Sequence, residues 1–226
     1  MNVELHFNTN VNDFKITNQK VNQVQTNKGD FFCSRAINCA GLFSDEVSKK
    51  AGIRHDFSII PRKGSYLVFD PLKVKISNVL FPVPSEKGKG TLVSTTTHGN
   101  TLAGPDNEPC IDKYDTAVSG QSMDNIMKNA KKLVPCLEPS NIIASYSGIR
   151  ASGNGDRDFI IELPEQKRGL INLCGIESPG FAAAPAIALR VVELLKESGL
   201  KLKEKTSWNP VRKPFPHIHM MGRREK

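Results

Sequence analysis

Three features that define large classes of protein are missing from the sequence. It contains no run of about 18 apolar residues, so no membrane-spanning helix is predicted. It begins Met-Asn-Val-Glu-Leu-His, without the basic and apolar segments of a secretory signal peptide. It also lacks a GxGxxG turn between a strand and a helix, since the glycine-containing segment 153–155 has neither the spacing nor the flanking elements.

Cysteine is scarce and scattered. The five cysteines, an odd number, lie at positions 33, 39, 110, 136 and 174, and none belongs to a CxxC pair. Their mostly apolar surroundings are typical of reduced, buried thiols and not of a disulfide framework or a metal site. We therefore expect a cytoplasmic protein without a bound metal.

Acidic residues are outnumbered, 23 against 31 lysines and arginines, which gives a formal charge of +8. The excess is concentrated at 201–205 and 212–226, where aromatic residues are not interleaved with it. No helix-turn-helix, zinc-finger or RNP pattern is present. We therefore interpret the charge as a solvated face and a linker, and expect no binding to nucleic acid.

At 226 residues the chain can bury roughly 70% of its unfolded surface, as one large domain or two small ones. Short strand patterns dominate its middle, and a strand, a glycine corner and a helix follow one another near each end. This order predicts an α+β fold. Residues 1–54 and 165–200 are expected to form one layer, 55–164 an antiparallel sheet, and 201–226 a basic, proline-rich tail or linker.

Two local patterns give sharper expectations. Strand patterns at 58–61 and 65–70 flank Arg62-Lys63-Gly64, which predicts a tight turn at these three residues. The run from Ala183 to Leu195 is almost continuously small or aliphatic, so we expect a helix that is buried on most of its surface. Ser178-Pro179-Gly180 precedes this run and is typical of a helix start.

Four short segments stand out when they are taken in order: Ile37-Asn-Cys-Ala-Gly-Leu, Pro61-Arg-Lys-Gly-Ser-Tyr, Gly148-Ile-Arg-Ala and Cys174-Gly-Ile-Glu-Ser-Pro-Gly. Together they resemble the FAD-dependent oxidoreductases of the D-amino-acid oxidase and glycerol-3-phosphate dehydrogenase superfamily. With the segment from His98 to Pro105 added, the resemblance extends to the branch that oxidises L-2-hydroxyglutarate.

Members of this family begin with a GxGxxG-bearing strand and helix that hold FAD, and the present chain has no such segment. The resemblance therefore implies the C-terminal portion of a longer flavoenzyme, inactive as an isolated fragment. Such a portion would hold part of a Rossmann-like FAD-binding layer and an antiparallel substrate sheet. Its missing partner would be the N-terminal FAD-domain segment.

The resemblance also implies which residues face FAD. They lie at the two glycine corners: Ala40, Gly41, Gly175, Ile176, Glu177, Ser178, Gly180 and Phe181. Backbone N–H groups at a helix start suit the negative charge that develops on a reduced flavin. Ordinary strand–helix connections remain the alternative interpretation of both corners.

Candidate substrate residues lie between the corners. Arg150, at a strand end, is the best candidate to anchor a substrate carboxylate, because a guanidinium donates two parallel hydrogen bonds to such a group. The alternative is an ion pair of Arg150 with Asp156 or Asp158. Arg62 and Tyr66 are further candidates for substrate binding. His98 is the candidate base for the hydroxyl proton, against a purely structural role.

The function implied is hydride transfer to FAD from the CH–OH group of a small anionic substrate, such as glycerol 3-phosphate or L-2-hydroxyglutarate. The corner Glu177–Gly180 lacks the basic residue with which glycerol-3-phosphate dehydrogenases usually hold phosphate, which favours a hydroxy-carboxylate. Two alternatives stay open. One is oxidation of the CH–NH bond of an amine or amino acid, and the other is a binding module that never held FAD.

Overall fold

The computed structural model describes residues 3–53, 57–83, 90–154, 158–165, 169–207, 209 and 211. Most of the tail expected at 201–226 lies outside these residues. The strands are β1 (Val11–Thr17), β2 (Lys20–Thr26), β3 (Gly29–Phe32), β4 (Ala36–Asn38), β5 (Ile59–Phe69), β6 (Leu92–Thr95), β7 (Thr101–Gly104), β8 (Glu108–Pro109), β9 (Ile142–Gly153), β10 (Ile160–Glu162) and β11 (Leu170–Cys174). The helices are α1 (Ser44–Lys50), α2 (Gly120–Ala130), α3 (Gly180–Glu197) and the 3₁₀ helices η1 (Gly41–Phe43) and η2 (Pro139–Asn141).

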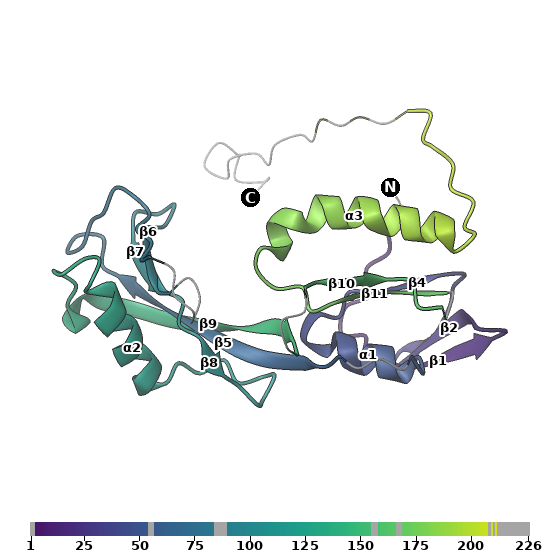
Figure 1. The fold of residues 1–226 in the computed structure, drawn as a ribbon, viewed down its shortest axis with the longest axis horizontal. Helices are drawn as coiled ribbons and strands as arrows, with labels where there is room; N and C mark the ends of the chain where they lie inside the picture. The colour runs from purple at the N-terminus through teal and green to yellow at the C-terminus, as the bar shows by residue number, and fades with distance from the viewer. Residues whose placement is uncertain are drawn as a thin grey trace, which may run out of the picture.

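One part of the molecule is a layered unit in which α3 lies over β10 and β11 (Figure 1). Its three-stranded sheet has the order β10-β11-β4, with β11 parallel to β4, and an antiparallel meander β1-β2-β3 lies beside it. Adjacent residues of β11 face opposite sides of this sheet. Leu170 packs with Val21 and Ala51 on one side, whereas Ile171 packs with Val191 of α3 on the other.

The other part is a five-stranded sheet built around β5, with β9 along one edge of that strand and β7 and β8 along the other. Leu67 and Phe69 of β5 are fully buried against Ile126 of α2. The long pair β5 and β9 reaches from this sheet to the layered unit (Figure 1). Antiparallel sheets combined with a layered unit confirm the predicted α+β class.

The structure corrects the turn expected at Arg62-Lys63-Gly64. β5 runs unbroken from Ile59 to Phe69, because β9 pairs with it along that whole length. A further difference concerns β10, which pairs with β11 in the layered unit and not with the antiparallel sheet of 55–164.

The structure also corrects the burial expected for α3. Phe181 is fully exposed and Leu189 is 70% exposed, while the buried positions of the helix are Gly180, Val191 and Leu194. In the described part of the chain, α3 contacts β10 and β11 on one side, so its outer apolar face has no cover. No helix among the described residues is both long and apolar enough to cross a bilayer.

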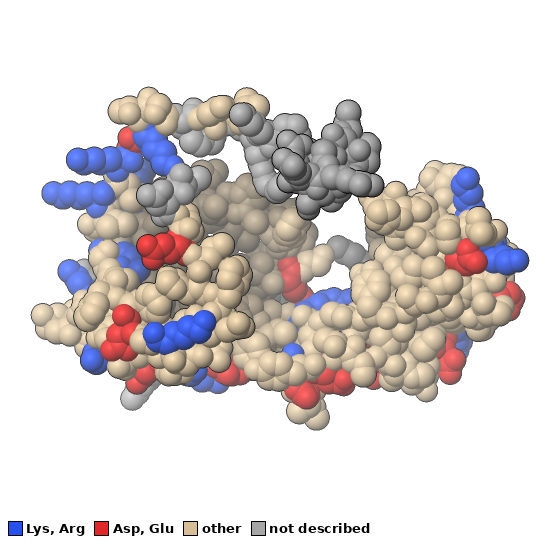
Figure 2. All heavy atoms as spheres, turned by 180° about the vertical axis from the view of Figure 1, so that it is seen from behind, with Lys and Arg blue, Asp and Glu red and all other residues tan. Residues whose placement is uncertain are grey.

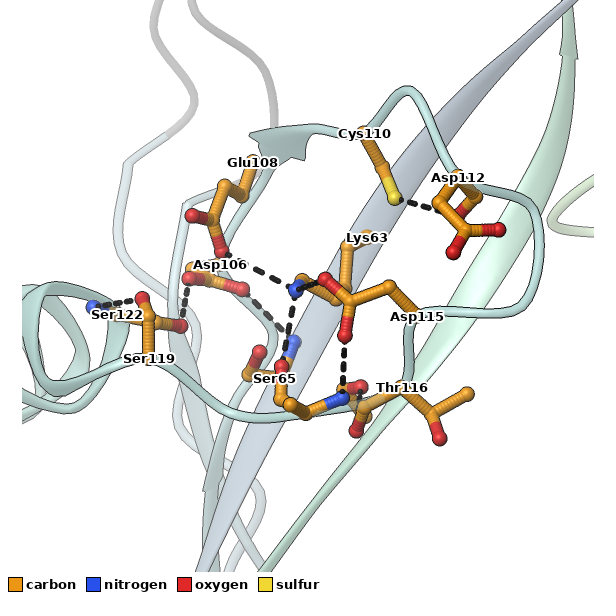
Figure 3. Close-up of polar contacts among 12 residues, drawn as sticks. Lys63, Ser65, Asp106, Glu108, Cys110, Asp112, Asp115, Thr116, Ser119 and Ser122 are labelled. Carbon is orange, nitrogen blue, oxygen red and sulfur yellow. Dashed lines mark hydrogen bonds and ion pairs between the residues drawn. The ribbon is translucent and has the colours of Figure 1, made fainter.

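Lys63 lies on the α2 side of β5 and is only 5% exposed. Its Nζ is 3.0 Å from Oδ2 of Asp115 and 4.0 Å from Oε2 of Glu108, and it donates to the carbonyl of Ala117 at 2.9 Å (Figure 3). The hydrogen bond to Asp115 raises the pKa of Lys63. The pKa of Asp115 is lowered by the amide of Ala117 and then by Lys63. This network holds the segment after β8 against β5.

Candidate functional site

The two glycine corners lie side by side. β4 and β11 are parallel neighbours that pair Asn38 with Asn172, and each corner follows the carboxyl end of its strand. The Asn38 side-chain amide donates to Asn172 Oδ1 at 3.1 Å, and its own oxygen accepts the N–H of Ala40 at 3.1 Å. Gly41 and Gly175 have φ of 54° and 66°, a left-handed conformation that favours glycine. In open α/β sheets, ligands bind outside the carboxyl ends of the strands, where these corners meet.

The corner after β11 forms a hollow lined by Ile176 to Ala182. No side chain caps α3, and the N–H of Gly180 donates to the backbone carbonyl of Glu177. The N–H groups of Phe181 and Ala182 have no acceptor among the described residues and are available to a ligand. They carry the positive end of the helix dipole and therefore suit an electron-rich edge of a flat ligand. Glu177 is turned toward β9, where its Oε2 accepts the hydroxyl of Ser152 at 2.6 Å.

The outer face of the β5–β9 pair carries the predicted substrate residues. Arg62 lies directly opposite Arg150, and Tyr66 directly opposite Tyr146, so all four side chains share one face. The two tyrosine rings stack with centroids 5.3 Å apart. Sequence reasoning missed Tyr146, although its spacing of four residues from Arg150 places both on the same face of a strand.

Arg150 has no carboxylate partner in the described part of the chain. One Nη of Arg150 donates to the backbone carbonyl of Asp106 at 3.2 Å. The Asp158 carboxylate accepts the N–H of Phe159 at 2.7 Å and is not paired with Arg150, and Asp156 lies outside the described residues. Burial raises the pKa of Tyr66, an effect that the charge of Arg150 opposes. The two opposed arginines thus form a cationic surface without a protein anion among the described side chains.

The cationic surface and the α3 corner adjoin each other. Ser152, which bonds Glu177, is two residues from Arg150 on the same strand face, about 7 Å along the strand. A Cβ built on Gly175 would lie 3.7 Å from the backbone nitrogen of Gly153. Figure 2 shows the molecule hollowed between its two parts, with basic and acidic side chains at the floor of the hollow.

The structure does not bring His98 to this site. His98 is exposed in the turn between β6 and β7, and Thr101 at the start of β7 pairs with Phe69. Arg62, which pairs with Arg150 of β9, lies seven residues before Phe69 along β5, a separation of roughly 20 Å. The geometry therefore gives His98 no contact with the group that Arg150 would bind.

Cysteine reactivity gives a direct test of the corner after β11. Cys174 is fully buried and burial raises its pKa to about 11, whereas Cys136 is exposed. Because the thiolate is the reactive form, we expect iodoacetamide at pH 8 to alkylate Cys136 at least about 100-fold faster than Cys174. Mass mapping of a time course measures both rates. Equal rates would contradict the packing of this corner.

The exposure of Cys136 and Cys39 also corrects the expectation that the thiols are generally buried.

Comparison with known proteins adds three kinds of match. A family model described as FAD dependent oxidoreductase matches residues 1–194. A glycerol 3-phosphate dehydrogenase of Caloramator mitchellensis is 37% identical over 205 residues, which cover 90% of this chain and 42% of the relative. A glycerol 3-phosphate oxidase of Mycoplasma genitalium is 35% identical over 209 residues, covering 86% of this chain and 53% of the relative.

More distant relatives and solved structures agree with these matches. The mitochondrial L-2-hydroxyglutarate dehydrogenase of Arabidopsis thaliana is 33% identical over 171 residues, or 67% of this chain and 35% of the relative. The reduced, FAD-bound L-alpha-glycerophosphate oxidase of Mycoplasma pneumoniae has a TM-score of 0.78 at 31% identity, over 89% of this chain and 53% of that one. The chain spans about half the length of these proteins, or less.

Proposed function

Because the chain belongs to the FAD dependent oxidoreductase family, we propose that it is the C-terminal portion of a longer flavoenzyme that oxidises the CH–OH group of a small anionic substrate. One observation carries this proposal. The two glycine corners meet at one edge of a parallel pair of strands, beside a sheet face on which Arg62 and Arg150 are uncompensated in the described structure. A nucleotide site and an anion site are thereby neighbours.

The corners fit FAD by their geometry. The hollow from Ile176 to Ala182 is bordered by uncapped amides of α3, and Ala40 and Gly41 lie at the neighbouring strand end, where the adenosine side would approach. When bound, FAD supplies the acceptor for the hydride that leaves the substrate carbon. The amides of Phe181 and Ala182 would stabilise negative charge at the ring edge that faces them.

The sheet face fits the substrate anion. Like charges placed directly opposite each other destabilise a sheet, so an anion bound between Arg62 and Arg150 would offset their repulsion. A guanidinium can form bidentate pairs with both phosphate and carboxylate. We propose glycerol 3-phosphate as the first candidate, because the relatives with 37% and 35% identity carry that substrate in their names. L-2-hydroxyglutarate is the second. The two arginines would supply the positive charge that the corner at Glu177 lacks.

The proposed partner of this chain is the segment that precedes it in a longer protein. β4 is an edge strand in the described sheet, and Ile37 on its α3 side is 45% exposed. Leu189 and Val192 of α3 are exposed as well. Parallel strands are normally covered on both faces, so a further strand and helix would complete this layer. Five unpaired thiols agree with a cytoplasmic protein.

FAD content tests the proposal. The term complete gene product means the protein translated from the whole natural reading frame, including any residues encoded before Met1. We expect a GxGxxG segment in that preceding part, and close to one FAD per complete gene product after purification. The isolated 226-residue chain is expected to retain almost none, because half of its nucleotide site would be missing. The FAD released on denaturation gives the ratio. Stoichiometric FAD on the isolated chain would contradict the proposed division of the site.

A further inference from the structure

The side chain of Arg150 crosses the central strand of its sheet. Arg150 belongs to β9 on one side of β5, whereas the carbonyl that it bonds belongs to Asp106 on the other side. The guanidinium lies over Gly64, and a Cβ built on Gly64 would be 2.7 Å from Cζ of Arg150. Any larger residue at position 64 would displace the guanidinium. Gly148, directly opposite Gly64 on β9, has no atom within 4 Å of its built Cβ.

Asp106 occupies a gap along the edge of β5. The chain leaves β5 after Gly104 and returns at Glu108, so the N–H of Ser65 has no strand partner there. Oδ1 of Asp106 accepts this N–H at 2.7 Å, and Oδ2 accepts the hydroxyl of buried Ser122 in α2 (Figure 3). The carboxylate is thus fixed at both oxygens, and it fixes the backbone carbonyl beside it.

The choice of acceptor matters for the charge of Arg150. If the carboxylate of Asp106 faced the guanidinium, it would neutralise the positive charge that an anionic substrate needs. The carboxylate instead faces Ser65 and Ser122, and the hydrogen-bond acceptor that Arg150 meets among the described residues is a neutral carbonyl. A guanidinium has five N–H donors, so one bond to a carbonyl leaves the others for a bidentate anion.

We propose that Gly64 and Asp106 are positioning residues that hold the guanidinium of Arg150 flat across β5, ready to bind the substrate anion. We call this arrangement the arginine seat: Gly64 provides the space and Asp106 provides the anchor. That the guanidinium is held in order to bind a substrate anion rests on the proposed function. The placement of the guanidinium by Gly64 and Asp106 does not, so the two claims are tested separately.

The seat is tested without any ligand by nitrogen-15 NMR of the 226-residue chain. The side-chain signals of Arg150 are assigned by their loss in Arg150→Lys. We expect Gly64→Ala and Asp106→Ala to shift these signals and to speed rotation of the guanidinium. Gly148→Ala is the matched control and leaves them unchanged. Asp106→Asn also preserves them, because its amide can still accept from Ser65 and donate to the oxygen of Ser122.

Titration with inorganic phosphate then tests the purpose of the seat. Gly64→Ala and Asp106→Ala are each expected to weaken phosphate binding about tenfold, and neither weakens it further in the Arg150→Lys background. Unchanged Arg150 signals in both alanine variants would overturn the seat. Altered signals with unchanged phosphate affinity would support the seat and contradict the anion site of the proposed function. Because Gly64 lies in β5 and Asp106 in the segment between β7 and β8, misfolding of one variant leaves the other decisive.

Discussion

Replacing Arg150 with methionine is expected to raise the KM of the complete gene product for its anionic substrate by at least about 100-fold, while its FAD content stays unchanged. The reason is the loss of charge-assisted hydrogen bonds at a half-buried position, worth about 2.7 kcal/mol or more. Arg150→Lys is expected to recover only part of the loss, because an ammonium lacks the planar fork of a guanidinium. Steady-state kinetics with glycerol 3-phosphate and L-2-hydroxyglutarate measure the effect.

Arg190 provides the matched control for this variant. It is an exposed arginine on α3 that pairs with Glu193 at 2.9 Å and Glu197 at 3.0 Å. Because exposed ion pairs contribute little and Arg190 is paired with two carboxylates of its own helix, Arg190→Met should leave KM unchanged. If Arg150→Met also left KM within about threefold of the original value, the anion site would be elsewhere.

Replacing Lys63 with methionine is expected to lower the free energy of unfolding by about 1–3 kcal/mol, since it removes the buried ammonium that donates to Asp115 and to the carbonyl of Ala117. The loss stays below that of a fully buried pair because Asp115 and Glu108 are partly exposed, so water can solvate them. Lys131 pairs with Glu138 at the surface, and Lys131→Met should cost less than about 1 kcal/mol. Urea unfolding of the 226-residue chain compares the two. Equal losses would contradict the buried network.

The ion pair between Lys63 and Asp115 makes the stability of the fold depend on pH in a defined direction. The pKa of Asp115 is lowered in the folded chain. Its ionised carboxylate therefore stabilises the fold above the unfolded pKa of about 4, and this stabilisation is lost as the pH falls through the lowered pKa. The pKa of Lys63 is raised, so its contribution persists until the pH rises past that value. We therefore expect the stability difference between the original chain and Lys63→Met to shrink between pH 7 and pH 3. A difference that grew on acidification would contradict the pairing.

The glycine corners could be predicted from sequence because their signal is local. A strand, a glycine and a helix in succession require a left-handed residue at the turn, and Gly41 and Gly175 meet that need. That the corners adjoin follows from β4 and β11 being parallel neighbours. The sequence suggested this pairing through the order of its motifs, whereas the hydrogen bonds of Asn38 fix it.

Features that depend on distant partners could not be predicted. Arg62-Lys63-Gly64 has the composition of a turn, yet pairing with β9, more than eighty residues later, keeps it in a strand. The alternation of that strand then sends Lys63 to the core and leaves Arg62 outside. For α3, an apolar composition predicted burial, but burial depends on what lies against the helix. The distance of His98 from Arg150 likewise follows from strand register.

The most direct test of the account is anaerobic reduction of the flavin in the complete gene product. If the corners hold FAD beside the arginines, glycerol 3-phosphate or L-2-hydroxyglutarate will bleach the flavin, and Arg150→Met will need far more of the same substrate. Glycine, which offers a CH–NH bond, will leave the flavin oxidised. A product without FAD, or a flavin that glycine reduces and neither hydroxy anion does, would contradict the account.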